Sequence, residues 1–93
     1  MLRVDYDELA VSAKALRTEG DNFEDCIDKM QTTINGLPDI WEAETSTQYV
    51  TQFTEARTKS LDKVREMIED MATQMEKISD NFAKADADMK SQM

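Results

Sequence analysis

The stretch NGLPDIWEA at residues 35–43 decides the fold of this chain. It contains the only proline, the only tryptophan and one of the two glycines among 93 residues. Gly36 stands where a glycine commonly ends a helix, and Pro38 disfavours helical geometry at the residue before it. Because long helical patterns lie on both sides, the stretch predicts a short turn over residues 36–39 that reverses the chain.

Upstream of the turn, about residues 4–35 carry the pattern of one long helix. Apolar residues recur there in alternating steps of three and four, which places them on one narrow stripe. Gly20 lies on the stripe, and we expect a neighbouring helix or a bulky side chain to approach closely at this position, with a break in the helix as the alternative. The stripe consists of Tyr6, Leu9, Ala13, Leu16, Gly20, Phe23, Ile27, Met30, Ile34 and Leu37.

Downstream, the same spacing predicts a second helix over about residues 40–88, followed by a tail to residue 93. Asp39 and Glu42 resemble a capping box at its start. Two successive steps of four, at residues 60, 64 and 68, form a stutter, which unwinds a coiled coil locally. The stripe runs through Tyr49, Phe53, Ala56 and Ser60, and then through Leu61, Val64, Ile68, Met71, Met75, Ile78, Phe82, Ala85 and Met89.

These patterns predict an all-α fold, with residues 1–93 as one domain in which two helices form an antiparallel hairpin. A lone hairpin leaves the edges of both stripes in water, so we expect two hairpins to pack antiparallel as a four-helix-bundle dimer. The predicted core of hairpin and dimer consists of Leu9, Leu16, Phe23, Ile27, Met30, Ile34, Phe53, Leu61, Val64, Ile68, Met71, Met75 and Ile78.

Composition argues against several classes of function. The net charge of −9 disfavours nucleic acid, which is bound through Lys and Arg, and also disfavours adsorption to anionic lipid. The chain has no histidine, the commonest general base and metal ligand. We therefore expect no enzyme, no catalytic residues, no metal site and no cofactor. The single cysteine, Cys26, is interpreted as a half-buried small side chain, with an intermolecular disulfide as the alternative.

The first nine residues contain acids and no long apolar run, so we expect no cleaved signal peptide. No stretch approaches the roughly 20 apolar residues of a membrane span. Trp41 allows two interpretations. Beside a tight turn it is first interpreted as a plug for the end of the hairpin, and the alternative is an anchor for a partner, because tryptophan is frequent in binding hot spots.

The layout of the whole chain resembles the WXG-motif family, the early secreted antigenic target-like substrates of type VII secretion. The motif is Trp41-Glu42-Ala43 here, with alanine in place of the family's glycine. The tail resembles the family's C-terminal export signal, an aromatic residue followed four positions later by an acid, with further hydrophobic residues beyond. Phe82, Asp86, Met89 and Met93 fill these positions.

The resemblance implies a small secreted protein without a cleaved signal, which pairs with itself or with a paralogous family member. It also implies that the secretion ATPase reads Trp41 and Ala43 in the turn together with the tail residues. After export, the family's roles are those of virulence-associated effectors or export adaptors. Two alternatives stay open: a cytosolic coiled-coil adaptor, and a membrane-disrupting effector, although an interaction with a membrane is not favoured.

Overall fold

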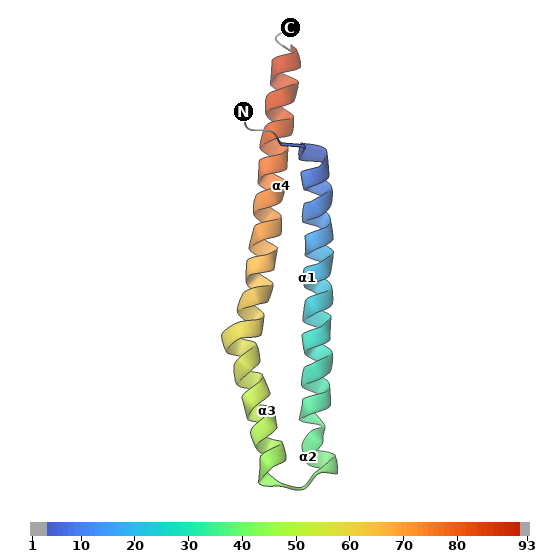
Figure 1. Ribbon diagram of the computed structural model, residues 1–93, viewed down its shortest axis with the longest axis vertical. Coiled ribbons are helices and arrows are strands. Elements are labelled where there is room, and N and C mark those ends of the chain that lie inside the picture. The colour runs from blue at the N-terminus through green and yellow to red at the C-terminus, as the bar shows by residue number, and fades with distance from the viewer. Residues whose placement is uncertain (1–3, 92–93) are drawn as a thin grey trace.

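The computed structural model describes residues 4–91, which form two long helical arms lying side by side (Figure 1). The first arm is α1 (Tyr6–Asn35), and the second arm consists of α3 (Glu44–Ala56), the π-helical segment η1 (Arg57–Leu61) and α4 (Asp62–Ser91). The short helix α2 (Leu37–Ile40) follows α1 at the end where the two arms join, and the described residues contain no strand. The hairpin measures 75 × 18 × 17 Å. The predicted all-α antiparallel hairpin is therefore confirmed.

A side-chain cap sets the start of α1. The Asp5 carboxylate accepts a hydrogen bond from the backbone N–H of Glu8 at 3.1 Å, which satisfies one of the free donors of the first turn. Asp7 and Glu8 add negative charge where the helix dipole favours it. The helix begins at Tyr6, two residues later than expected, because Asp5 adopts extended backbone geometry as the cap.

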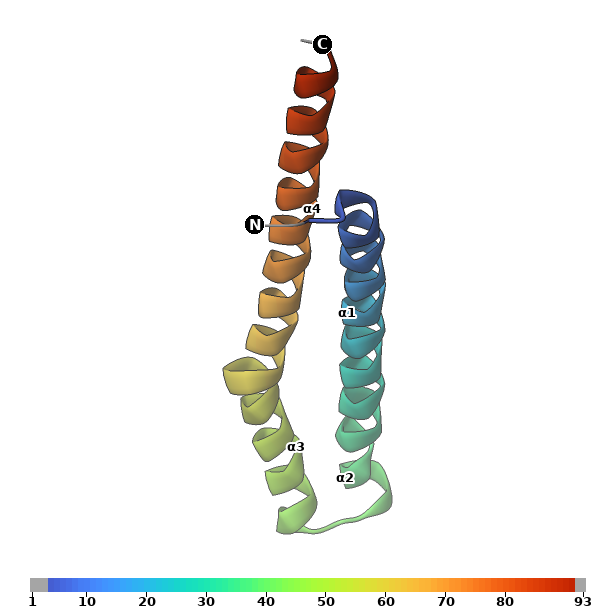
Figure 2. The ribbon, with the colours of Figure 1, turned by 45° about the horizontal axis from the view of Figure 1, so that its top comes forward.

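The reversal of the chain differs from the predicted one. Gly36 keeps right-handed helical geometry (φ −81°, ψ −12°), and residues 37–40 form α2 instead of a turn. Pro38 is accepted in the first turn of α2, where a missing N–H leaves no helical hydrogen bond unmade. Asp39 lies inside α2, so the predicted capping box is wrong. The second arm begins at Glu44 rather than at residue 40, after an extended link that crosses the end of the hairpin (Figure 2).

The predicted stutter coincides with a π turn. Residues 57–61 form η1, whose hydrogen bonds span five residues instead of four, and the wider turn is visible between α3 and α4 (Figure 2). A π turn contains extra backbone per turn, so it rotates everything downstream relative to α3. Which side of α4 faces α1 therefore depends on this turn.

The seam between α1 and α4 is built from small side chains. Ala13, Ala72, Gly20 and Ser79 are buried, and Ile27 is the one large aliphatic side chain that is fully buried within residues 4–91. On α4 the positions that face α1 are 65, 72 and 79, each one residue after the predicted 64, 71 and 78. Small residues let the two backbones approach closely. The side of α4 that carries these three positions therefore faces α1, and the larger side chains next to them lie to one side of the seam.

Gly20 permits the closest approach along the seam. A Cβ atom added there would lie 2.9 Å from Ile68 Cγ2 and 3.0 Å from Arg65 Nη1, which confirms the expected close approach of bulky side chains. Arg65 passes over Gly20 and is only 17% exposed. It reaches Asp21 at 2.6 Å and Glu24 at 3.3 Å on α1.

Arg65 belongs to a set of ion pairs that lines one side of the hairpin, which we call the ion-paired flank. Three arginines on this flank, Arg65, Arg17 and Arg57, bridge the two arms. Arg17 pairs with Glu69 and Glu76, and Arg57 pairs with Asp28 at 2.6 Å. Exposed pairs of this kind add little stability individually. Their main effect is to give this flank a polar, already satisfied surface.

The two glycines allow a matched test of the seam. Replacing Gly20 with Leu should lower the free energy of unfolding by about 1–2 kcal/mol, because the displacement of Ile68 and Arg65 outweighs the gain in helix propensity. Gly36→Ala should instead raise it by about 0.4–1 kcal/mol, because the added methyl has room and Gly36 is already helical. Urea unfolding followed by circular dichroism at one protein concentration measures both. Equal effects at the two sites would contradict the close approach.

Candidate functional site

The flank opposite the ion pairs is apolar. Val64, Met71 and Ile78 on α4 are 39%, 49% and 44% exposed, and Met30 on α1 is 41% exposed. Phe23, Ile68 and Met75 are half-buried beside them, on the same side by helical spacing. We call these seven residues the apolar face.

The apolar face divides the predicted core into two groups. In the single hairpin Met30, Val64, Met71 and Ile78 are exposed, because residues 65, 72 and 79 occupy the seam, so their predicted place in the core of hairpin and dimer stays a prediction for the dimer. The remaining predicted residues are buried or half-buried in the single hairpin. Ile27 is buried, and Leu9, Leu16, Phe23, Ile34, Phe53, Leu61, Ile68 and Met75 are half-buried.

A groove of about 280 Å³ continues the apolar face toward the turn, between α1 and α3. Met30, Ile34 and Phe53 supply its apolar lining, with Cys26 at its edge; Lys29 and Thr33 complete the lining. Cys26 is exposed and not half-buried as interpreted from the sequence, because it lies on the outer edge of the stripe rather than on the seam.

Trp41 lies in the extended link after α2 and is 41% exposed. Its indole packs edge-on against Tyr49 of α3, with ring centroids 5.6 Å apart and an interplanar angle of 65°. This geometry suits the aromatic quadrupoles. An indole that served purely as a plug would be buried, whereas this one is supported on one side and open on the other.

Ser46 holds the link in shape. Its hydroxyl lies 2.8 Å from the carbonyl oxygen of Trp41 and 2.7 Å from that of Ala43, and the residue is 1% exposed. Ala43 has extended backbone geometry (φ −154°, ψ 150°), which any residue adopts. Alanine therefore replaces the expected glycine without strain. Sequence analysis missed Ser46, whose only signal is a small hydroxyl side chain in the first turn of a helix that lacks a side-chain cap.

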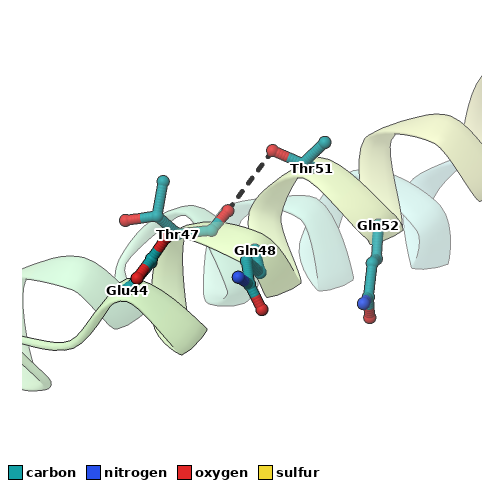
Figure 3. A pocket seen from close by; sticks show the side chains of 5 residues that line it. All are labelled: Glu44, Thr47, Gln48, Thr51 and Gln52. Carbon is teal, nitrogen blue, oxygen red and sulfur yellow. Dashed lines mark hydrogen bonds between the residues drawn. The ribbon is translucent and has the colours of Figure 1, made fainter.

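A polar groove of about 310 Å³ lies along the outer side of α3 (Figure 3). Glu44, Thr47, Gln48, Thr51 and Gln52 line it, at the three- and four-residue spacing of one helix face. Across residues 4–91, no three His, Cys, Asp or Glu side chains are grouped so that they could hold a metal ion. The groove has the character of a solvated helix face.

The tail residues lie at the other end of the molecule. Phe82 and Asp86 are half-buried, and Met89 is 67% exposed in the part of α4 that extends past α1 (Figure 1). Met93 lies outside the described residues. The Asp86 carboxylate accepts a hydrogen bond from the Tyr6 hydroxyl at 3.0 Å and pairs with Lys90 at 3.2 Å. Sequence analysis did not connect Tyr6 with the tail, because the contact spans 80 residues.

These contacts shift the ionisation of the groups involved. The hydrogen bond from Tyr6, followed by Lys90, lowers the pKa of the Asp86 carboxyl. The same hydrogen bond raises the pKa of the Tyr6 phenol, and Asp86 raises the pKa of Lys90. Each shift favours the ordinary charge of the group at neutral pH, which is an ionised Asp86 and a neutral Tyr6.

A single hairpin keeps the two predicted recognition elements apart. The Trp41 link lies at the end where the arms join, and the tail lies at the open end (Figure 1). The hairpin is 75 Å long, so one chain does not bring them together. No helix within residues 4–91 is sufficiently long and apolar to cross a membrane.

The fold and its exposed surfaces define a class: a helical hairpin with a tryptophan at the reversal and one apolar face left open. A family model described as "Proteins of 100 residues with WXG" matches residues 1–87. The chain therefore belongs to this WXG100 family, as its sequence features suggested. Members are small helical proteins of the type VII secretion substrate kind, not known as enzymes, and they typically form dimers with family members. No curated protein and no solved structure matched the chain.

The hydrogen bond between Tyr6 and Asp86 predicts a pH dependence of the open end. Because folding lowers the pKa of Asp86, its ionised carboxylate stabilises the folded state. This stabilisation is complete above the ordinary pKa of about 3.9 and is lost as pH falls through the lower pKa of the folded state. Carboxyl carbon chemical shifts recorded by NMR across this range measure the pKa. In Tyr6→Phe the pKa of Asp86 should rise toward its ordinary value while Lys90 keeps part of the shift. An unchanged titration would contradict the assignment.

Proposed function

We propose that this protein is exported by a type VII secretion system as an antiparallel four-helix-bundle dimer, and that the secretion ATPase recognises a surface formed by both chains. The observation that carries the proposal is the contrast between the two flanks of the hairpin. One flank has ion pairs that are satisfied within the chain. The other presents the apolar face, which water solvates poorly.

A second copy fits the apolar face better than a nucleic acid or an anionic membrane does. The chain carries a net charge of −9, so it repels both of those surfaces. The apolar face follows the long axis of the hairpin on α1 and α4, and two such faces packed together make the core of a four-helix bundle. Either a second copy or a paralogue presents a surface of this shape.

The antiparallel arrangement explains why two recognition elements lie at opposite ends of one chain. When two hairpins pack in opposite directions, the Trp41 link of one lies near the tail of the other. Trp41 supplies an apolar anchor that is already oriented by Tyr49. Phe82, Met89 and Met93 add apolar contact, and Asp86 adds a directional charge. One chain supplies both halves of this surface, which favours a homodimer.

After export, we propose a role through protein–protein contacts, as a virulence-associated effector or as an adaptor that accompanies other substrates. The same apolar face that pairs two copies would serve this role if the dimer exchanges subunits. The rival assignments, a cytosolic coiled-coil adaptor and a membrane-disrupting effector, are outcomes of the experiments below.

The dimer is tested by one charge on the apolar face. Met71→Glu should weaken self-association at least roughly 30-fold, because each chain would bury a carboxylate without a partner. Gln74→Glu adds the same charge to the exposed outer side of α4 and should leave association unchanged. Sedimentation equilibrium measures both. If the wild-type chain is a folded monomer at micromolar concentration, the proposal of a homodimer fails.

The export surface is tested by Trp41→Ala and by a chain that ends at Asn81. Each should reduce the protein in culture supernatant by about tenfold or more, and Trp41→Ala should leave helicity and thermal stability near wild type, because hot-spot residues contribute mainly to binding. Parallel loss of folding and export in Trp41→Ala would support the plug instead. Wild-type protein confined to the cells would favour the cytosolic adaptor. Leakage of dye from liposomes, tested at neutral and acidic pH, would favour the membrane-disrupting effector.

A further inference from the structure

Tyr6 is attached to α4 at two points. Its backbone carbonyl accepts a hydrogen bond of 2.6 Å from the hydroxyl of Ser79, a residue that is only 5% exposed. Its own hydroxyl donates to Asp86 Oδ2 at 3.0 Å. Ser79 and Asp86 are seven residues apart and so lie two turns apart on one side of α4. Tyr6 therefore spans the last two turns of α4 that α1 can reach.

Beyond this contact the tail has little support. α1 begins at Tyr6, and α4 continues to Ser91 without α1 beside it (Figure 1). Within residues 4–91, no hydrogen bond joins α1 to α4 past Asp86. Helix ends without tertiary contacts fray, since the last turns gain few hydrogen bonds for the residues they order. Among the described residues, the Tyr6 hydroxyl thus makes the last side-chain hydrogen bond from α1 to this part of α4.

Whether the segment from Phe82 to Met89 is helical affects how a partner can bind it. Phe82 and Met89 are seven residues apart, so they share one side of α4 only while the segment between them stays helical. Asp86 keeps a fixed position relative to both under the same condition. A partner that contacts all three residues would otherwise have to order them, and that ordering weakens association.

We propose that Tyr6 is a positioning residue for the tail recognition surface: by holding Asp86 it keeps the segment from Phe82 to Met89 helical, and thus in the form that the secretion ATPase binds. This inference rests on the proposed function. It extends the recognition surface to α1, a part of the chain that neither the turn motif nor the tail motif includes. In the alternative, Tyr6 masks Asp86 from the partner, and removing the Tyr6 hydroxyl would then strengthen binding.

Tyr6→Phe tests the positioning role because it keeps the ring and removes only the hydroxyl. We expect amide hydrogen exchange of residues 87–91 to accelerate while the amides of residues 13–34 and the melting temperature stay as in wild type. We also expect affinity of the full-length protein for the purified secretion ATPase to fall roughly 3- to 10-fold. The matched control is Thr18→Val, which removes an exposed hydroxyl of α1; that hydroxyl bonds only to the backbone carbonyl of Lys14 in the same helix.

A double-variant cycle shows whether Tyr6 acts through Asp86. Tyr6→Phe in the background of Asp86→Ala should cause no further loss of affinity, because the group that the hydroxyl positions is already gone. Additive losses would mean that Tyr6 contacts the ATPase directly, which would overturn the positioning role. Tighter binding or increased export in Tyr6→Phe would also overturn it, in favour of masking.

The chain that ends at Asn81 separates failure of this inference from failure of the proposed function. If that truncation binds the ATPase as well as wild type, the tail is not a recognition element and both statements fall. If the truncation loses binding but Tyr6→Phe binds with wild-type affinity and normal tail exchange, only the role of Tyr6 falls. The inference stands if the truncation loses binding, Tyr6→Phe loses part of it, and Thr18→Val loses none.

Discussion

The close approach of α1 and α4 is the constraint on which the rest of the structure depends. At Gly20 the two helices leave no room for a Cβ atom, and Ala13, Ala72 and Ser79 continue the narrow seam above it. A seam lined by such small residues accommodates few large side chains. The chain has many large aliphatic and sulfur-containing residues, and most of them must therefore lie beside the seam instead of within it.

The arginines determine on which side those residues lie. Arg17, Arg57 and Arg65 occupy one flank with acidic partners from the opposite arm, so the large apolar side chains gather on the other. A hairpin with a single open apolar face has a different assembly behaviour from one with two. Two copies can cover each other's apolar face in an isologous contact, which closes the assembly at two chains.

Periodicity was sufficient to predict the hairpin, the position of its reversal within a few residues, and most of the side chains between the arms. It could not predict which of two adjacent rows of residues on α4 faces α1. Ile68 and Met75 border both the row that contains Met71 and the row that contains Ala72, and hydrophobicity alone favoured the more apolar one. The contacts of Ser46 and Tyr6 left no periodic signal, because each is a hydrogen bond fixed by tertiary geometry. Local rules also misplaced the turn, since Pro38 starts a short helix as readily as it ends one.

The separation of the Trp41 link from the tail would give the proposed dimer a further property. Either element alone lies on one end of a 75 Å rod, so a receptor that needs both cannot be satisfied by a single hairpin. Only a folded, antiparallel pair places them together. Recognition of the combined surface would thus report in one step that each chain has folded and that the two have paired. A partly unfolded chain can still display a short tail motif, and it would fail this requirement because the second element would not lie beside it.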